Sequence, residues 1–485
     1  MQLLSIQLSA FEESSFIINA QSKAGEATSR SSLPFYENTT KWRTTLIKIL
    51  EIGKFSLAKF SDEEKIWMAQ ESLLLSDGNG FSADYLEKIG RSLYKALFPT
   101  GEVSDLLQRS IALAEKDSNP QLHIQIKFSA KVTELNRLPD YPWEMVHDGQ
   151  RFLAHHNVTF SRYIAHLSAP PKLSAVSPIN VLLVSSGASD EENGLAPLSK
   201  KEHEAVKKGL EKSQEDGHIR FREPEQASFK ALEIYLTEHR GDDAPHVLHF
   251  DGHGVFGKRC QNSECRTFYG NLNLTQCKKC KTALSAPQGY LLFEPDEDDD
   301  DEREANYVSA EEIGSLLRSI RHGDSESQQG GVRLAVLSAC KSAYALGGDS
   351  VFNGVAQSLI WHGVPAVVAM QYTVSVQSAT AFANRFYREL GNKQSLAVAT
   401  SQGREAMRKD QNQWYRLIFY LRWQANDGGQ LFATEDLSTR KNKIANLFKV
   451  PDLPKRSLPR DEDVAALKEL VLGESANKLV MTGVA

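Results

Sequence analysis

The alternation of apolar and polar positions changes character along the chain, and this change separates two regions. Near the N-terminus, LSIQLS and SSFIINA alternate with a period of two, which predicts half-buried strands. Apolar positions at helical spacing then predict helices over residues 41–52, 62–74, 82–97 and 103–115. We expect the stretch 25–33 to be a loop. Residues 1–120 are therefore predicted to form a mixed α/β scaffold region.

Beyond residue 120, short continuous apolar runs alternate with helical patterns. Strands are predicted at 121–129, 179–186, 218–222 and 247–250, in GYLLFEP, VRLAVLSAC and PAVVAMQ, and at 416–422. Helices are predicted at 199–214, 227–240 and 309–320, in SVFNGVAQSLIWHG, and at 375–390 and 394–409. This alternation predicts an α/β fold with a parallel-type sheet flanked by helices. Trp143, in the proline-rich stretch LPDYPWEMVHD, is predicted to fill a core.

Two of the predicted strands end in residues with reactive side chains. The run 247–250 stops at DGHG, which contains His253, and the run VRLAVLSAC ends at Cys340. In parallel sheets, the loops beyond the carboxyl ends of the strands form the functional edge. If the two strands are neighbours, an imidazole and a thiol meet at that edge. The sequence therefore predicts Cys340 as a nucleophile and His253 as the group that protonates the leaving amine.

The glycines on either side of the histidine support this interpretation, since a lone cysteine that ends a strand is more often a small core residue. Gly252 and Gly254 let the backbone approach a ligand closely, and we expect core packing not to need them. The backbone N–H groups of Gly254 and Cys340 are candidates for an oxyanion hole. Asp251 or His249 could orient the imidazole, although a core histidine is the more ordinary interpretation of His249.

Four of the five cysteines fall close together, at Cys260, Cys265, Cys277 and Cys280. Two thiolate pairs at this spacing resemble a zinc ribbon, in which two turns each offer two sulfurs to a tetrahedral ion. We predict a structural Zn²⁺ on these ligands, in an insertion over residues 258–283. Two disulfides are the alternative and fit a reducing compartment poorly. Four thiolates leave no open coordination position, and HExxH is absent, which argues against a metalloprotease.

Composition and charge restrict the classes of partner. The net charge is −6, with 24% charged and 41% hydrophobic residues, which is ordinary for a soluble globular protein and gives no support to general nucleic-acid binding. No apolar run approaches the roughly 18 residues of a membrane span. The N-terminus lacks the basic leader of a signal peptide. We therefore expect a cytoplasmic protein without a membrane partner.

Two charged stretches leave alternatives open. The predicted insertion carries Lys258, Arg259, Arg266, Lys278, Lys279 and Lys281. Basic side chains are common on solvated zinc ribbons, and nucleic-acid contact is the less favoured alternative. The acidic run DEDDDDERE at 296–304 is interpreted as a solvated loop, with a calcium site as the alternative.

The motifs LPDYPWEMVHD, HFDGHG and LSAC, followed by GGDSVFNGVAQSLIWHGVPAVVA, resemble in order the signature of CHAT domains, caspase-like cysteine peptidases related to separase. The resemblance implies a caspase-like (caspase/haemoglobinase) fold over residues 121–437. It also implies a His253–Cys340 dyad and a protein substrate cleaved after a preferred residue. Relatives that accept a basic residue need an acidic pocket, for which Asp349 and Asp190 are candidates. MQYTVSVQSA departs from the family's Trp and acidic residues at that place, so cleavage specificity stays open.

The C-terminal composition shifts at VPDLPKRSLPRDED, which is typical of a linker. Residues 457–485 resemble the entry to a STAND-type signalling NTPase, although no GxxxxGK[ST] motif is present. We expect residues 438–485 to be a linker and the start of a truncated STAND NTPase-like module, and the protein to continue beyond it. This resemblance implies an effector protease of bacterial immunity, such as antiviral defence, that a sensor module and homo-oligomerisation activate. A catalytically silent caspase-like scaffold with a structural zinc is the alternative.

Overall fold

The computed structural model divides the chain into two compact units, Met1–Thr434 and Glu435–Ala485. The structure describes residues 1–12, 14–35, 41–51, 57–117, 121–128, 138–155, 157–165, 170, 173, 176–196, 200–296, 305–323, 331–338, 351–409, 412–423 and 428–432. The predicted linker and STAND-like segment at 438–485 and the acidic residues 297–304 therefore lie outside the described residues. None of the described helices combines the length and the apolarity that crossing a bilayer requires.

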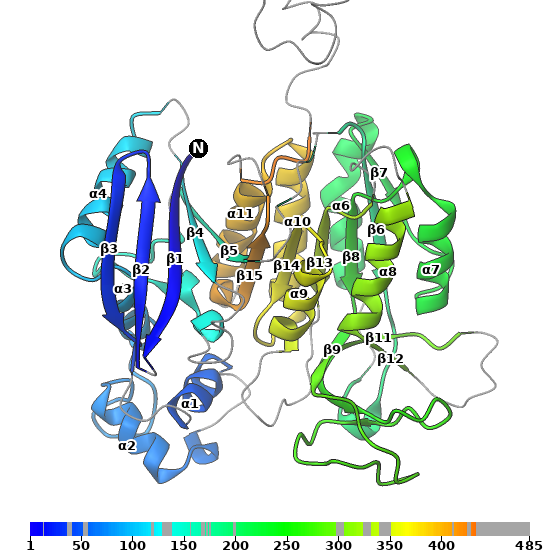
Figure 1. Ribbon diagram of the computed structural model, residues 1–485, viewed down its shortest axis with the longest axis horizontal. Helices are drawn as coiled ribbons and strands as arrows, with labels where there is room; N and C mark the ends of the chain where they lie inside the picture. The colour runs from blue at the N-terminus through cyan, green and yellow to red at the C-terminus, as the bar shows by residue number, and fades with distance from the viewer. Residues whose placement is uncertain are drawn as a thin grey trace, which may run out of the picture. The chain divides into compact units, whose positions relative to one another are not determined.

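Among the described residues, an eleven-stranded sheet runs through the first unit, in the order β3-β2-β1-β4-β5-β15-β14-β13-β8-β6-β7 (Figure 1). The strands are β1 (Gln2–Glu12), β2 (Ser15–Ser22), β3 (Gly25–Ser32), β4 (Leu122–Phe128), β5 (Val158–Ile164), β6 (Ile179–Ser185), β7 (Ile219–Arg222), β8 (Val247–Asp251), β13 (Leu334–Ser338), β14 (Ala366–Met370) and β15 (Leu417–Leu421). Strands β7, β6, β8, β13 and β14 are mutually parallel. The parallel-type sheet predicted from the sequence is therefore confirmed, and an antiparallel strand, β15, follows β14.

The N-terminal strands join this same sheet. β1 pairs with β2 antiparallel and with β4 parallel, in a register that sets Leu4 opposite Ile124. The predicted loop at 25–33 is wrong, because β3 forms the sheet edge there. Only Ala27 and Ser31 of β3 are buried, so no apolar pattern in the sequence predicts this strand. Its hydrogen-bonded pairing with β2 stabilises it instead.

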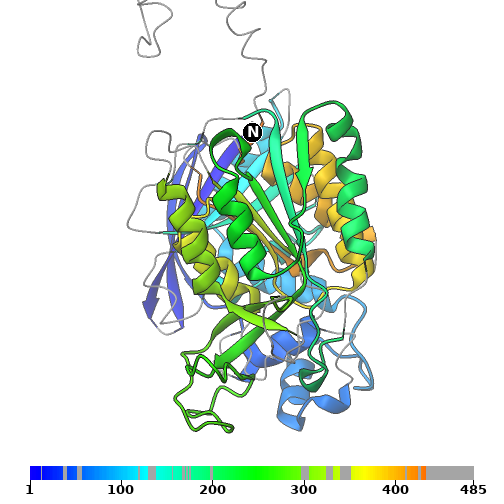
Figure 2. The same ribbon diagram turned by 90° about the vertical axis from the view of Figure 1, so that its right-hand side faces the viewer.

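Two helical layers cover the sheet. The helices α6 (Lys201–Glu215), α10 (Val376–Gly391) and α11 (Leu396–Lys409) lie on one face, and α7 (Phe229–Glu238), α8 (Ala310–Gly323) and α9 (Val351–Trp361) lie on the other (Figure 2). Helices α3 (Tyr85–Leu97) and α4 (Glu102–Ala114) contact the N-terminal strands. Two further helices, α1 (Lys41–Leu50) and α2 (Asp62–Gln70), lie between β3 and α3 in the chain. The amphipathic patterns in the sequence thus correspond to helices that cover a buried sheet.

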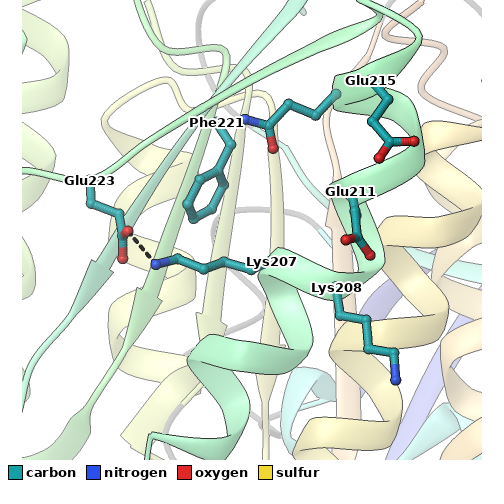
Figure 3. A pocket seen from close by; sticks show the side chains of 7 residues that line it. Lys207, Lys208, Glu211, Glu215, Phe221 and Glu223 are labelled. Carbon is teal, nitrogen blue, oxygen red and sulfur yellow. Dashed lines mark ion pairs between the residues drawn. The ribbon is translucent and has the colours of Figure 1, made fainter.

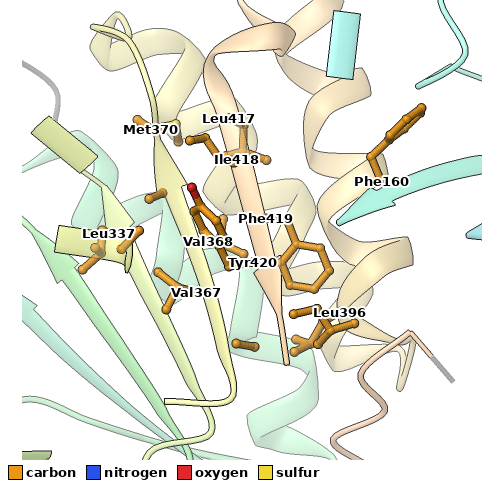
Figure 4. Packing of buried hydrophobic residues seen from close by; sticks show 14 of the residues in the cluster. Phe160, Leu337, Val367, Val368, Met370, Leu396, Leu417, Ile418, Phe419 and Tyr420 are labelled. Atoms are coloured by element: carbon orange, nitrogen blue, oxygen red, sulfur yellow. The ribbon is translucent and has the colours of Figure 1, made fainter. Parts of the chain in front are cut away.

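The middle of the sheet is the apolar core (Figure 4). Val367, Val368 and Met370 of β14 lie beside Leu417, Ile418, Phe419 and Tyr420 of β15, all almost fully buried. Leu337 of β13 and Leu396 of α11 extend the cluster on either side. Burial of each such side chain contributes about 1.5–3 kcal/mol, which fixes β14 and its neighbour β13 firmly in place.

A buried ion pair anchors the adjoining strand β5. The Arg162 guanidinium donates to both carboxylate oxygens of Glu144, at 2.9 and 2.6 Å. Burial alone would raise the pKa of Glu144, but the charge of Arg162 holds that pKa below its usual value. The neighbouring Trp143 is fully buried and its Nε1 donates to the Leu138 carbonyl at 2.7 Å. The predicted core position of Trp143 is confirmed.

A second sheet has the order β10-β9-β11-β12. Its strands are β9 (His253–Arg259), β10 (Phe268–Tyr269), β11 (Gln288–Phe293) and β12 (Asn306–Ser309). β9 begins where β8 ends and carries the chain toward the cysteine-rich insertion (Figure 1).

Candidate active site and metal centre

The two strands that end in DGHG and LSAC are direct neighbours. β8 and β13 run parallel with Asp251 opposite Ser338, and the Gly252 N–H donates to the Ser338 carbonyl at 3.1 Å. His253 and Cys340 each follow their strand's last residue by two positions. The sequence left open whether these two strands are neighbours, and the structure shows that they are. Cys340 itself lies outside the described residues.

His253 is fully buried and is the first residue of β9, opposite Leu292 of β11. Its Nε2 lies 2.7 Å from the carbonyl oxygen of Ala196. Since a carbonyl oxygen only accepts, Nε2 carries the proton, and in the neutral ring Nδ1 keeps the lone pair. The imidazole is therefore held in one tautomer, with Nδ1 as the nitrogen able to take a proton.

The glycine before His253 has a packing role. A Cβ on Gly252 would lie 2.5 and 2.6 Å from ring atoms of Phe250 and 3.3 Å from Cβ of Ser186. The expectation that core packing does not need this glycine is therefore wrong. Gly254 is buried in β9 opposite Leu291, so the predicted oxyanion donor belongs to a strand.

The two residues considered as orienting partners, His249 and Asp251, lie two positions apart on β8. His249 is fully buried, its Nδ1 lies 2.7 Å from the Tyr387 hydroxyl, and burial lowers its pKa to about 3. Its interpretation as a core histidine is confirmed. The carboxylate of Asp251 accepts a hydrogen bond from the Ser185 hydroxyl at 3.2 Å, which ties β8 to β6.

Of the two candidate specificity residues, the structure describes only Asp190. Asp349 lies outside the described residues. Asp190 accepts hydrogen bonds from the backbone and side-chain nitrogens of Asn193, at 3.0 and 2.8 Å, and from the Tyr307 hydroxyl. These contacts order the loop that follows β6. A role for Asp190 in a substrate pocket stays a prediction.

A cavity of about 360 Å³ opens at the carboxyl ends of β6 and β7. Ser186 lines it, and the N–H of this residue donates to the Asp251 carbonyl at 2.8 Å, so the cavity borders the DGHG segment. Its titratable lining consists of Glu223, Glu225, Glu294, Lys200 and His203. No motif in the sequence marks Glu294 as a site residue, although its place at the end of the strand GYLLFEP was an available signal.

A larger hollow of about 790 Å³ lies between α6 and the edge strand β7 (Figure 3). Lys207 forms an ion pair with Glu223 at 2.8 Å, and its ammonium lies 5.8 Å from the centre of the Phe221 ring. The residues that line this hollow include no histidine or cysteine. We assign it no catalytic chemistry.

The four clustered cysteines converge on one point. Their Sγ atoms all lie within 4.8 Å of one another, and the closest pairs are Cys260–Cys280 at 3.3 Å and Cys265–Cys277 at 3.6 Å. Sulfurs at about 2.3 Å from a tetrahedral zinc are about 3.8 Å apart, so the donor set fits this ion. A disulfide needs about 2.05 Å, and all four cysteines are free.

The two cysteine turns repeat one local structure. Cys265 and Cys280 are each followed by a residue with positive φ and then by a threonine. The Oγ1 atoms of Thr267 and Thr282 lie 3.2 and 3.3 Å from the sulfurs of Cys265 and Cys280. The Cys280 thiol donates to the Thr282 hydroxyl, and the Thr267 hydroxyl donates to the Cys265 carbonyl at 3.3 Å, so each threonine stabilises the turn of its own cysteine.

The ionisation of the thiols is uneven without a cation. A hydrogen bond with Tyr269 lowers the pKa of Cys277 to about 6, whereas burial raises the pKa of Cys260 to about 12. Four neighbouring thiolates repel one another, and a divalent ion would relieve this repulsion while releasing the remaining protons.

The insertion lies farther from His253 than the few intervening residues suggest. β9 is extended from His253 to Arg259, and six steps of about 3.3 Å place the first cysteine turn about 20 Å away. Both views show this segment beyond the edge of the large sheet at which β8 ends (Figures 1 and 2).

The fold and this site define an α/β protein with a mostly parallel sheet and a tautomer-fixed histidine at its carboxyl edge. The family model described as "CHAT domain" matches residues 87–447, so the chain belongs to the CHAT domain family. No curated protein matches the sequence.

Solved structures of the Saccharomyces cerevisiae separase–securin complex were also matched. The structure at 3.0 Å resolution has 13% identity and a TM-score of 0.40, covering 86% of this chain and 30% of the separase chain. The structure at 2.6 Å has 12% identity and a TM-score of 0.41, covering 87% and 30%. The chain thus spans less than a third of the length of those proteins.

Proposed function

We propose that this chain is a caspase-like cysteine endopeptidase with Cys340 as nucleophile and His253 as acid–base partner. The observation that carries the proposal is the register of β8 and β13. It brings the ends of both strands together through the hydrogen bond from Gly252 to Ser338. Membership of the CHAT domain family supports the same assignment.

In the proposed reaction, the thiol of Cys340 gives its proton to Nδ1 of His253 while the sulfur bonds to the scissile carbonyl carbon. The imidazolium then protonates the amine as the C–N bond breaks, and water hydrolyses the thioester and restores the thiol. The N–H groups of Gly254 and Cys340 would stabilise the oxyanion. The Ala196 carbonyl favours the imidazolium, because it accepts from Nε2 throughout.

We further propose the wider role and organisation that the sequence suggests. Residues 1–120 would be a scaffold and 121–437 the peptidase. Residues 438–485 would link the peptidase to a STAND-type sensor module. The protein would act in the cytoplasm as an effector of bacterial immunity, activated by that sensor and by homo-oligomerisation. Its substrate would be a protein, and Asp190 and Asp349 remain candidates for the specificity pocket.

The peptidase proposal is tested by comparing the wild-type chain with Cys340→Ala and His253→Ala on a panel of fluorogenic peptides, with forced dimerisation. We expect cleavage by the wild type and a loss of at least a thousandfold in both variants. His249→Gln is the matched control, since this histidine is buried against Tyr387. Equal rates in the wild type and Cys340→Ala would remove the peptidase assignment and leave a catalytically silent scaffold.

We also propose that Cys260, Cys265, Cys277 and Cys280 hold a structural Zn²⁺. Metal analysis after extensive dialysis should give one equivalent of zinc per chain, and Cys277→Ser should lower it. A folded protein without metal under these conditions would contradict the site.

A further inference from the structure

Four exposed cations surround the cysteine turns. Arg266 follows Cys265, Lys278 and Lys279 lie between Cys277 and Cys280, and Lys281 follows Cys280; this set is called the cationic tip. The other two basic residues of the insertion have partners. Lys258 donates to the Leu274 carbonyl at 2.9 Å, and Arg259 pairs with Glu312. Among the described residues, no carboxylate forms an ion pair with the tip.

The charge of the insertion is opposite to that of the chain. Residues 258–283 contain six basic residues and only one acidic residue, Glu264, whereas the whole chain has a net charge of −6. A zinc ion with four thiolates has a charge of −2. The loaded insertion therefore still carries three net positive charges.

Two residues of the tip occupy positions that favour glycine. Arg266 has φ of 42° and Lys281 has φ of 62°. A side chain in this left-handed region costs roughly 1 kcal/mol relative to glycine. Both cysteine turns thus place a basic side chain where glycine would cost less, so a glycine substitution there removes a charge without straining the turn.

The surroundings of the tip favour a polypeptide over a nucleic acid. Single-stranded nucleic acids bind where aromatic rings are available for stacking. The aromatic residues of the insertion are Phe268, which is buried, and Tyr269, whose hydroxyl contacts Cys277 and accepts from the Lys278 N–H. Burial closes the ring of Phe268 to stacking, and the hydroxyl contacts of Tyr269 hold the remaining ring against the second cysteine turn.

We propose that the cationic tip binds an acidic segment of the polypeptide that the dyad cleaves; this inference rests on the proposed peptidase function. About 20 Å separates the tip's turn from His253 along β9, and an extended peptide spans that length with about six residues. The preferred substrate then carries several Asp or Glu residues about six or more positions from the scissile bond.

Binding is measured first, without cleavage. The probe is a fluorescent peptide that carries a tract of glutamates, added to zinc-loaded Cys340→Ala protein at low salt. The test variant adds Arg266→Gly and Lys281→Gly, which remove two charges and relieve backbone strain. The control adds Lys208→Gln and Lys212→Gln, two exposed lysines of α6.

Two exposed ion pairs correspond to roughly 2–30-fold in affinity. We expect a loss in this range for the glycine variant, no change for the control, and weaker binding as salt rises. Equal binding by all three proteins would overturn the inference. Tighter binding of a charge-matched single-stranded RNA would assign the tip to nucleic acid instead.

Cleavage is then measured with the active chain on two peptides that differ only in an acidic or neutral extension. We expect a lower KM for the acidic peptide, lost in Arg266→Gly/Lys281→Gly, with kcat on the neutral peptide unchanged. If neither peptide is cut, the peptidase proposal fails. The binding measurement then still shows whether the cationic tip binds an acidic segment. If both are cut with equal KM, only the role of the tip fails.

Discussion

Next to His253, the packing of the Phe250 ring requires that residue 252 has no Cβ. In Gly252→Ala, the new Cβ would meet the ring of Phe250 at 2.5 Å. We expect a loss of about 1–3 kcal/mol in the free energy of unfolding, measured by urea denaturation. Gly270→Ala is the control, because a Cβ there has no heavy atom within 4 Å. Similar losses in both variants would show that the Phe250 contact does not matter.

Three buried histidines make the stability depend on pH. Burial lowers the pKa of His123 and His246 to about 4 and that of His249 to about 3. In the unfolded chain they titrate near 6.5. Above that pH they are neutral in both states. As pH falls below 6.5, the three histidines become protonated in the unfolded chain but stay neutral in the folded chain, so the free energy of unfolding falls.

The expected slope is about 1.4 kcal/mol per pH unit for each histidine between about pH 6 and 5. Urea unfolding at several pH values measures it. His249→Phe should reduce the slope by about one histidine's contribution, whatever it does to stability at pH 7. An unchanged slope would mean that His249 is protonated in the folded state.

Site residues could be predicted from the sequence where residue type and position along the chain pointed to the same role. The spacing of the four cysteines marked them as one group, and the place of His253 after an apolar run marked it as a candidate site residue. The packing reason for Gly252 was not readable, because it depends on where the Phe250 ring turns. The Ala196 carbonyl that fixes the imidazole comes from 57 residues earlier in the chain, and no local pattern marks it.

Among the elements, β9 and α8 are clamped together beside the first cysteine. Arg259 donates to both carboxylate oxygens of Glu312, at 3.0 and 3.1 Å. Glu312 also accepts from the Ser309 N–H at 2.7 Å, as in a capping box at the start of α8. One carboxylate therefore caps a helix and positions the strand that leads into the insertion.

Replacing that carboxylate should loosen the insertion. We expect Glu312→Ala to lower stability by about 1–3 kcal/mol and to speed amide exchange in β9 and β12, measured by mass spectrometry. Glu311→Ala is the matched control, because its side chain is exposed on the same turn. Equal exchange in the two variants would contradict the clamp.

Elements with a regular apolar pattern were predictable, whereas strands defined by pairing were not. β8, β13 and β14 are short apolar runs and were expected. β5 contains Ser161 and Arg162 in its buried stretch, and these polar residues hide the pattern because their partners come from elsewhere. β9 has two glycines and two basic residues, so only its ladder with β11 shows that it is a strand.

At the scale of the whole molecule, the N-terminal region completes the large sheet. β1 pairs with β4 over seven residues and buries Leu4, Ile6 and Leu8. Without β1, the whole length of β4 would be an unpaired edge, which promotes aggregation.

We therefore expect a fragment of residues 121–437 to aggregate and a fragment of residues 1–437 to stay monodisperse. Size-exclusion chromatography with light scattering measures this. A stable monomer of the shorter fragment would show that the scaffold is dispensable for folding.

The sheet order also limits how copies can cooperate. Within the described residues, the open edges of the large sheet are β3 and β7. If two chains joined their sheets through β3, seven strand spacings of about 4.8 Å would separate each junction strand from β13. The two β13 strands, beside which the proposed reactive centres lie, would then stand about 70 Å apart. Two such reactive centres cannot share one short peptide. Each site in such an assembly should then bind its own peptide independently, so substrate saturation should be hyperbolic.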